Sequence, residues 1–214
     1  MARTRDPGYE DQREMILAHA AHLFARQGYP ATSMNEVAEA CRFSKANLYH
    51  YYRDKYQLLL SIAEVHVSRL HAVVREVSAQ KLPAEHELRE LIRRFLEEYA
   101  DARDAHRVLT EDVRFLEPKD RARVLTKERE IVAGFALAVG RIHPHLRRAA
   151  LTKPLTMLLF GMINWMFTWM SAEGPLDHEA MAPIVADLFL GGLGAVKPPR
   201  QAAEPLSSAP GARR

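Results

Sequence analysis

The stretch that decides the fold is Ser33–Lys55, SMNEVAEACRFSKANLYHYYRDK, which predicts two short helices joined by a tight turn. The spacing Ser33-x-x-Glu36 has the form of a capping box, so a helix is expected to start directly after the serine. Ser44 can cap a second helix, which the pattern predicts over Lys45–Tyr52. The two helices and their turn form the unit from which the rest of the chain is interpreted.

The second of these helices combines an apolar face with an unusual polar one. Leu48 and Tyr52 lie four residues apart, so both are expected to point into a core. The remaining positions carry cationic, amide and aromatic side chains: Lys45, Asn47, Tyr49 and His50. A helix that exposes such a set suits the major groove of DNA, where phosphates and base edges accept and donate hydrogen bonds.

This segment resembles the helix-turn-helix of the TetR family of one-component repressors, whose pattern is roughly T-S-x-x-x-I-A-x-x-A-G-V-S-K-G-T-L-Y-x-Y-F-x-x-K. The match runs from Thr32 to Lys55 without a gap. It implies an all-α fold, with an N-terminal three-helix DNA-binding domain and a C-terminal helical domain for ligand binding and dimerisation. The expected partners are a double-stranded DNA operator, a small-molecule effector and a second copy of the chain.

The resemblance also identifies the residues expected at the DNA. Ser33 and Lys55 are expected on phosphates, while the exposed face of the second helix reaches base edges. The full predicted set is Thr32, Ser33, Arg42, Lys45, Ala46, Asn47, Tyr49, His50, Tyr51 and Lys55. Arg42 departs from the family pattern, because it stands where the turn glycine is usual. If that position requires a positive φ, the arginine carries roughly 1 kcal/mol of strain, unless it gains a phosphate contact instead.

Composition is compatible with this interpretation. The chain has 214 residues, 48% of them hydrophobic, which suffices for a real core, and its net charge of +3 is too small to indicate nucleic acid by itself. The single cysteine, Cys41, predicts a reducing, cytoplasmic setting. The charged N-terminus is unlike a signal peptide, and the apolar run Leu155–Met170 is short for a membrane span, so no membrane partner is expected.

Four segments are predicted along the chain: a flexible arm over residues 1–8, the DNA-binding domain over 9–55, the ligand-binding and dimerisation domain over 56–196, and a disordered tail over 197–214. Apolar periodicity predicts helices throughout, and no alternating strand pattern occurs. Outside the motif, the predicted helices are Tyr9–Gln27, Asp54–Gln80, Glu85–Ala102, Ala105–Leu116, Asp120–Ile142, Lys153–Ser171 and His178–Leu193.

The C-terminal domain contains no pattern typical of an enzyme or a metal site. Its histidines are scattered, without a Cys/His/Asp set that would complete a metal site. It also lacks a Gly-x-Ser-x-Gly motif, a phosphate loop and a dinucleotide fingerprint. The sequence therefore predicts no catalytic residue, no metal and no cofactor beyond an effector ligand.

The segment Leu158–Leu193 is the most informative part of this domain. Gly161 lies inside a predicted helix, where glycine usually marks a close approach by another helix or a ligand, and Asn164 needs a polar partner. The pattern F-G-M-x-N-W-x-x-x-W, followed by Gly-Pro, resembles the C-terminal domains of TetR-family regulators of fatty-acid, sterol and aromatic-acid catabolism, which answer to acyl-CoA thioesters. The simpler alternative is a dimer-interface helix whose Trp and Met side chains fill the seam.

An acyl-CoA needs an apolar pocket for its acyl group and cations for its nucleotide. The apolar candidates are Phe95, Leu109, Phe115, Met157, Phe160, Trp165 and Trp169, with Gly161 and Asn164 on the same helix. The cationic candidates are Arg103, Arg107 and Arg114, with Arg121 and Arg123 further along the chain. For each arginine, a solvated helix face is the alternative.

The hypothesis is therefore a homodimeric repressor that an acyl-CoA thioester, of a fatty, sterol or aromatic acid such as phenylacetyl-CoA, releases from its operator. A repressor of an efflux pump that answers to a lipophilic drug is the first alternative, since such a site can be wholly apolar or acidic. A helical enzyme or a scaffolding module without a DNA role is the remote alternative.

Overall fold

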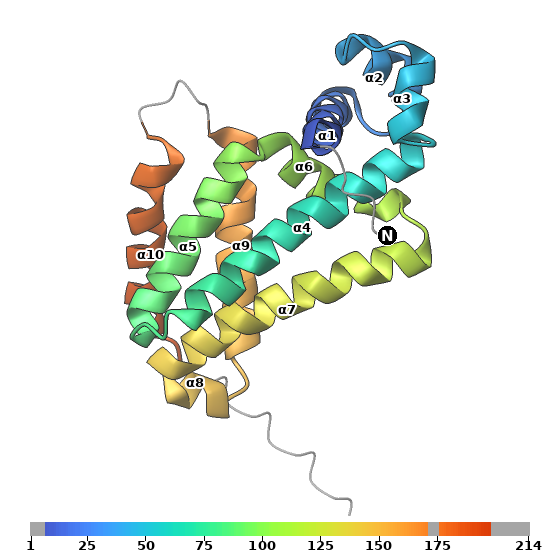
Figure 1. Cartoon of the computed structure of the whole chain (residues 1–214). Coiled ribbons are helices and arrows are strands. Elements are labelled where there is room, and N and C mark those ends of the chain that lie inside the picture. The colour runs from blue at the N-terminus through green and yellow to red at the C-terminus, as the bar shows by residue number, and fades with distance from the viewer. Residues whose placement is uncertain (1–6, 171–175, 198–214) are drawn as a thin grey trace, which may run out of the picture.

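The computed structural model describes residues 7–170 and 176–197, and these residues form an all-helical structure (Figure 1). This confirms the predicted fold class. The elements are α1 (Pro7–Gln27), α2 (Met34–Ala40), α3 (Lys45–Tyr51), α4 (Lys55–Ala79), α5 (Ala84–Asp101), α6 (Arg103–Glu111), the 3₁₀ turn η1 (Val113–Phe115), α7 (Pro118–Ile142), α8 (Pro144–Arg148), α9 (Thr152–Trp169) and α10 (His178–Leu193).

Side-chain caps set the starts of the helices that build the N-terminal head, which comprises α1, α2 and α3. The Ser33 Oγ accepts a hydrogen bond from the backbone N–H of Glu36, and the Glu36 carboxylate accepts one from the backbone N–H of Ser33, so the predicted capping box is present. The Ser44 Oγ accepts from the Asn47 N–H at 3.1 Å and starts α3. Asp54 caps α4 in the same way.

The long helix α4 connects this head to the C-terminal body and packs on α5, α6 and α7 (Figure 1). Its crossing with α7 is very close, because a Cβ added at Gly134 would lie 2.4 Å from Cγ1 of Val74. Only glycine allows this approach of the two backbones. In the body, α10 packs against α5, and α9 packs against α7.

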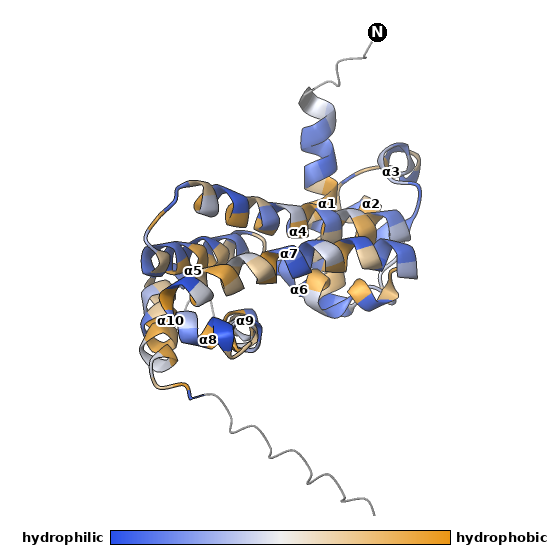
Figure 2. Ribbon diagram, turned by 90° about the horizontal axis from the view of Figure 1, so that it is seen from below, coloured by the Kyte–Doolittle hydropathy of each residue, from blue (hydrophilic) through white to orange (hydrophobic). Residues whose placement is uncertain are grey.

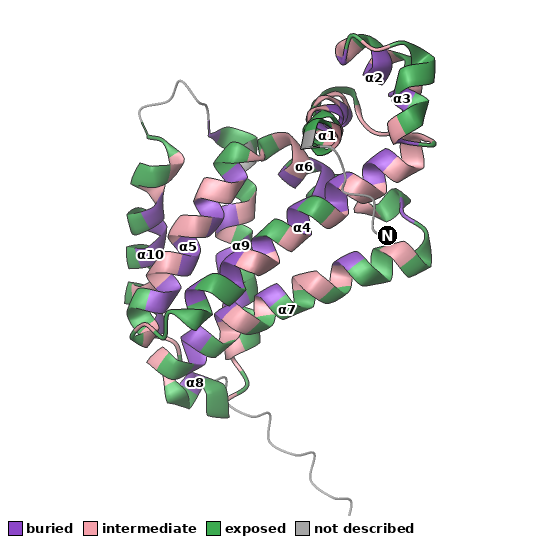
Figure 3. Cartoon of the chain, in the orientation of Figure 1, coloured by how far each residue is buried: buried purple, intermediate pink, exposed green. Residues whose placement is uncertain are grey.

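The core of the body lies where α5, α7 and α9 meet, and Figure 3 shows the buried residues on the inner faces of these helices. Three aromatic rings pack there edge to face or tilted: Phe135 lies 4.8 Å from Phe95 and 4.9 Å from Phe160 between ring centroids. In Figure 2, apolar residues cover much of α10. Within the described ranges, no helix is long and apolar enough to cross a membrane.

Several helix bounds differ from the sequence prediction. The helix predicted over Asp120–Ile142 begins two residues earlier, at Pro118, because proline fits the first helical position, where no backbone hydrogen bond is needed. The helix expected over Ala105–Leu116 ends at Glu111 and continues as η1. Pro144 starts the short α8, which was not predicted. Residues 7 and 8, assigned to the arm, already belong to α1.

The remaining predicted arm and nearly all of the predicted tail lie outside the described residues, as does the Gly174-Pro175 break between the last two helices. Near the other end of the body, the head is packed directly on it through α1 and α6. An ion pair of 2.9 Å between His22 Nδ1 and the Asp104 carboxylate joins these two helices.

Candidate nucleic-acid interface and ligand cavities

The outward face of α3 is the first candidate functional surface. Most of the residues predicted to contact DNA are exposed here and in the turns before α2 and α3: Ser33, Arg42, Lys45, Ala46, Asn47, Tyr49 and His50. The ammonium of Lys45 lies 6.0 Å from the centre of the Tyr49 ring, so a cation and an aromatic group stand together on this face. The surface therefore offers hydrogen-bond donors and the aromatic ring of Tyr49, and its described residues expose no large aliphatic side chain.

A shallow hollow of about 490 Å³ separates α3 from the loop that precedes α2. It is lined by Pro30, Ala31, Thr32, Ser33, Met34, Asn35, Lys45, Tyr49 and Lys55. Sequence reasoning missed Asn35, although this exposed amide at the start of α2 faces the same hollow. Its signal was its place directly after the cap residues, where a helix start approaches a phosphate.

The inward face of α3 is buried as the sequence predicts. Leu48 and Tyr52 are both 0% exposed. The Nε of Arg13 donates to the Tyr52 hydroxyl at 3.3 Å, and its guanidinium lies 5.0 Å from the centre of that ring. These contacts fix the orientation of α3 on α1, and so they fix which side chains face outward.

Two residues predicted at the DNA, Thr32 and Lys55, make contacts inside the head, although both also line the hollow beside α3. Thr32 is 1% exposed, and its hydroxyl donates to the carbonyl of Gly28. The Lys55 ammonium donates to three carbonyl oxygens, those of Tyr29 at 2.8 Å, Pro30 at 3.0 Å and Thr32 at 2.7 Å. These hydrogen bonds hold the α1–α2 loop. The phosphate contact expected of Lys55 stays a prediction.

Tyr51 is half-buried and also serves the head. Its ring lies between those of Tyr9 and Phe43, at centroid distances of 5.0 and 6.0 Å, and its hydroxyl donates to the side-chain oxygen of Gln12. This packing ties the end of α3 to the start of α1. The DNA contact expected of Tyr51 stays a prediction.

Arg42 occupies the turn between α2 and α3 with φ = +56°. The position therefore does require the left-handed conformation, as inferred from the family glycine, and the arginine carries that strain. Its side chain is exposed beside α3. The DNA contact proposed for it stays a prediction.

The residues predicted to form an acyl pocket are not gathered into one cavity of this chain. Phe95, Leu109 and Phe160 are buried in the core. The others lie on the surface, with Trp165 66% and Trp169 58% exposed, and Met157 half-exposed. A Cβ added at Gly161 would meet no atom within 4 Å. The outer face of α9 is therefore open in a single chain, which agrees better with the interface alternative.

The predicted arginines do not converge either. Arg103 donates to the carbonyl of Met170 at 3.2 Å, and Arg107 pairs with Glu111 one turn later on α6. The guanidinium of Arg114 lies over the ring of Phe115, which itself packs against the Tyr29 ring rather than in a pocket. Position along the chain was the only signal for this set, and the three arginines contact three different partners instead of one cavity.

A chain of buried polar groups crosses the body, and sequence reasoning identified only one end of it. The Tyr99 hydroxyl donates to Oδ1 of Asn164 at 2.8 Å, which supplies the partner expected for that amide. The Tyr99 ring stacks on His106 at 3.7 Å, and the ring nitrogens of His106 and His66 are 3.3 Å apart. Burial lowers the pKa of His66 to about 4 and that of His106 to about 3, so both are neutral at pH 7.

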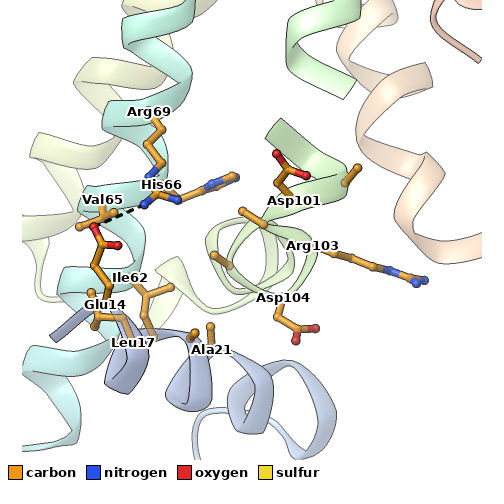
Figure 4. Close-up of a pocket in the computed structure, with 14 residues that line it drawn as sticks. Glu14, Leu17, Ala21, Ile62, Val65, His66, Arg69, Asp101, Arg103 and Asp104 are labelled. Carbon is orange, nitrogen blue, oxygen red and sulfur yellow. Dashed lines mark ion pairs between the residues drawn. The ribbon is translucent and has the colours of Figure 1, made fainter. Parts of the chain in front are cut away.

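Two further cavities border the body. One is a groove of about 730 Å³ between α7, α8 and the start of α9. The other, of about 390 Å³, lies where α1 meets α4 and the corner between α5 and α6 (Figure 4). Among the residues that the structure describes, no group of three or more His, Cys, Asp or Glu side chains could hold a metal ion.

Two family models match this chain. Residues 16–62 match the model of bacterial regulatory proteins of the tetR family, and residues 81–193 match the tetracyclin repressor-like C-terminal domain. The chain belongs to the TetR family. It is thus a ligand-responsive transcriptional regulator with a helix-turn-helix, and proteins of this family bind operator DNA and are generally not enzymes.

Individual relatives agree along nearly the whole chain. A TetR-family regulator from Bordetella parapertussis is 35% identical, with a TM-score of 0.81 over 88% of this chain and 98% of that one. The transcriptional activator FasR of Mycolicibacterium smegmatis is 27% identical over 194 residues, which cover 87% of this chain and 85% of FasR. AibR, solved with isovaleryl coenzyme A and operator DNA, shares the fold at 24% identity and a TM-score of 0.73, over 83% of this chain and 97% of AibR.

Proposed function

We propose that this TetR-family regulator is a homodimeric repressor that an acyl-CoA thioester releases from its operator. The observation that carries the effector class is the groove between α7, α8 and α9, which combines an apolar floor with a cationic rim. This is the pairing that a thioester of coenzyme A demands, since its acyl chain is apolar and its nucleotide carries several negative charges.

The floor of the groove comes from one stripe of α7. Its apolar members recur at helical spacing and are joined by one residue of α9: Leu125, Val132, Ala133, Ala136, Leu137 and Met157. Met157 is the one residue of the sequence-predicted acyl set that lines this groove. Apolar surface left open in this way favours an apolar ligand or partner.

The rim of the groove is strongly positive. Arg129, Arg147 and Lys153 are exposed there, and none has an ion-pair partner within residues 7–170 and 176–197. Arg141 lines the groove too but is engaged by the Glu87 carboxylate. The one acidic side chain in the lining is Glu128, whose pKa burial raises, so that its negative charge is disfavoured. The balance suits phosphate groups.

Relatives support the effector class without deciding it. AibR shares the fold and has been solved with isovaleryl coenzyme A and operator DNA together. KstR2 of Mycobacterium tuberculosis, a ketosteroid transcriptional regulator, shares the fold at a TM-score of 0.75. FasR is an activator, whereas KstR2 of Rhodococcus jostii, 26% identical over 120 residues, is a repressor. Repression is therefore part of the proposal, as are the effector and the dimer.

The dimer is proposed from the outer faces of α9 and α10. Large apolar side chains are exposed there at helical spacing: Leu158, Trp165 and Trp169 on α9, and Ile184 and Leu188 on α10. Gly161, Gly191 and Gly192 lie among them, with open space where a Cβ would stand. Two copies related by a two-fold axis would bury these faces against each other, and small residues would let the helices approach closely.

The test is operator binding followed by fluorescence anisotropy, with a panel of CoA thioesters, free CoA, the free acids and lipophilic cations. Release by thioesters alone is expected. Arg147→Glu should reduce sensitivity to the thioester by about tenfold or more, since it replaces an attraction to phosphate by a repulsion. Arg148→Glu is the matched control, because Arg148 is the exposed neighbour that does not line the groove.

Other outcomes would change the proposal. Release by free acids or lipophilic drugs, with no response to any thioester, would favour the efflux-type regulator. Equal loss of sensitivity in both arginine variants would show that the effector meets this surface only through general charge. A transcription assay that shows higher output with the protein bound would replace repressor by activator.

A further inference from the structure

We propose a second ligand site in this protein, in the cavity between α1, α4 and the α5–α6 corner, for a compact, uncharged, apolar molecule that bears a hydroxyl group (Figure 4). The site is separate from the groove proposed for the acyl-CoA, and the two share no lining residue. It stands on the shape of the cavity, on one buried polar atom and on the charges at its mouth.

Small side chains create the cavity. Alanines face it from α1 and from the α5–α6 corner: Ala18, Ala21, Ala100, Ala102 and Ala105. Leu17, Ile62 and Val65 add apolar wall. The volume of about 390 Å³ is near the lower end of small-molecule sites, so it suits a compact ligand and not a whole CoA thioester.

The buried polar atom is Nδ1 of His66. His66 lines the cavity, is 1% exposed, and its Nε2 already faces His106, whereas its Nδ1 has no hydrogen-bond partner among the described residues. A buried polar atom without a partner is costly, so a ligand that supplies one gains affinity. A hydroxyl can donate or accept, and therefore it satisfies either tautomer of the imidazole.

The charges around the mouth oppose an ionic ligand. The cations Arg69 and Arg103 stand against three carboxylates, Glu14, Asp101 and Asp104. Glu14 and Arg69 form an ion pair of 3.8 Å between α1 and α4, shown as the dashed line in Figure 4, and Asp104 pairs with His22. A polyanion would meet the carboxylates, and a cation would meet the arginines, so an uncharged molecule fits this mixed lining best.

The position of the cavity gives its occupant a role in regulation. One wall is α1, which belongs to the DNA-binding head, and the others belong to the long helix α4 and to the body. A ligand that fits one spacing of head and body better than another favours that spacing, and so it changes operator affinity reciprocally.

The experiment compares phenol with toluene, which replaces the hydroxyl by a methyl group of similar size. Thermal shift gives the affinities, and the ¹⁵N signals of histidine side chains report contact at His66. Phenol is expected to bind the full chain about 2–10-fold more tightly than toluene, which is the value of one hydrogen bond, and to move a histidine signal. In His66→Phe, the preference for phenol should disappear.

A cavity-filling variant tests the location. Ala18→Leu adds bulk from an exposed position of the cavity rim, so the fold should be kept while both probes lose their binding. Ala122→Leu, an equally exposed alanine on α7 outside every cavity described above, is the matched control and should bind like the original protein. Operator release by CoA thioesters should be unchanged in Ala18→Leu, which separates this proposal from the acyl-CoA one.

The proposal is overturned if phenol does not bind, if toluene binds as tightly as phenol, or if Ala18→Leu and Ala122→Leu bind phenol equally well. An unshifted set of histidine signals at saturating phenol would likewise remove His66 from the site.

Discussion

Helices α3 and α9 both expose large side chains, and these side chains differ in chemistry. α3 exposes Lys45, Asn47 and Tyr49 around a hollow lined by polar groups, whereas the outer face of α9 exposes Leu158 and Trp165, which are about two-thirds accessible. The first surface can pair with phosphates and base edges. The second is largely apolar, and an apolar partner surface would stabilise it most.

Exposed side chains therefore have two different origins in this chain. On α3, the exposed set is held by a buried set, since Leu48 and Tyr52 fix the helix on α1 and no partner is needed for stability. On α9, the exposed set extends the core outward and implies a missing partner. The polar helix needs no partner for its packing, whereas the dimer proposed above would cover the apolar one.

The largest expected effect comes from charging the apolar face. In Leu158→Glu/Trp165→Glu, self-association should weaken by about 100-fold or more, because each dimer would bury unpaired carboxylates. Sedimentation at micromolar concentration measures this, with circular dichroism to confirm that the helices remain. A well-folded monomer of the unsubstituted chain under the same conditions would remove the distinction between the two faces.

Lys55→Ala sharpens the division between the residues that hold the head and those that face DNA. Removing the ammonium that binds three carbonyls of the α1–α2 loop should cost about 1–3 kcal/mol in the free energy of unfolding. Urea denaturation is the measurement, and Lys45→Ala, on the exposed face of α3, should change stability by less than about 0.5 kcal/mol. Equal stabilities, with a smaller salt dependence of DNA binding for Lys55→Ala alone, would restore the phosphate contact.

The buried histidines predict a pH dependence of stability. Their folded pKa values of about 4 and 3 lie below the unfolded value near 6.5, so the unfolded state binds protons first as the pH falls. Stability should be fully present above about pH 6.5 and should decline from there toward pH 4. Urea unfolding across this range should show a shallower decline in His66→Phe than in the original chain. Parallel curves would exclude His66 as a cause.

Arg42→Gly has the smallest expected effect. Relief of the left-handed strain, less the greater flexibility of glycine in the unfolded chain, should stabilise the protein by about 0.5–1 kcal/mol. Thermal unfolding measures this gain, and operator binding of the same variant shows whether the arginine also contacts a phosphate. A destabilised Arg42→Gly would mean that the arginine side chain makes a stabilising contact that outweighs its backbone strain.

The head could be predicted from the sequence because its rules are local. Caps such as Ser33 and Ser44, and the spacing of Leu48 and Tyr52, act within one or two turns of helix and need no knowledge of distant contacts. Contacts between distant parts of the head were not predicted: Lys55 binds a loop more than twenty residues earlier in the chain, and no sequence pattern signals that contact.

The body shows why cavities could not be predicted in the same way. Its groove combines a stripe of α7 with Arg147 and Lys153. The cavity between α1, α4 and the α5–α6 corner is lined by several alanines, which no sequence motif marks as a site. The predicted arginines were chosen by position in the chain, but Arg107 pairs with Glu111 one turn away, and Arg103 binds the carbonyl of Met170. Convergence of distant side chains is a property of helix packing, which periodicity alone does not give.

The central claim is that the exposed face of α3 reads a DNA operator in two symmetric copies. The most direct test selects binding sites from a random pool of double-stranded DNA and then measures affinity for the enriched sequence. We expect a palindrome with half-sites about one helical turn or more apart. In Lys45→Ala/Tyr49→Ala, affinity for this sequence should fall by roughly 10–100-fold, while thermal stability is unchanged. Enrichment of no symmetric sequence, or full affinity in the double variant, would contradict it.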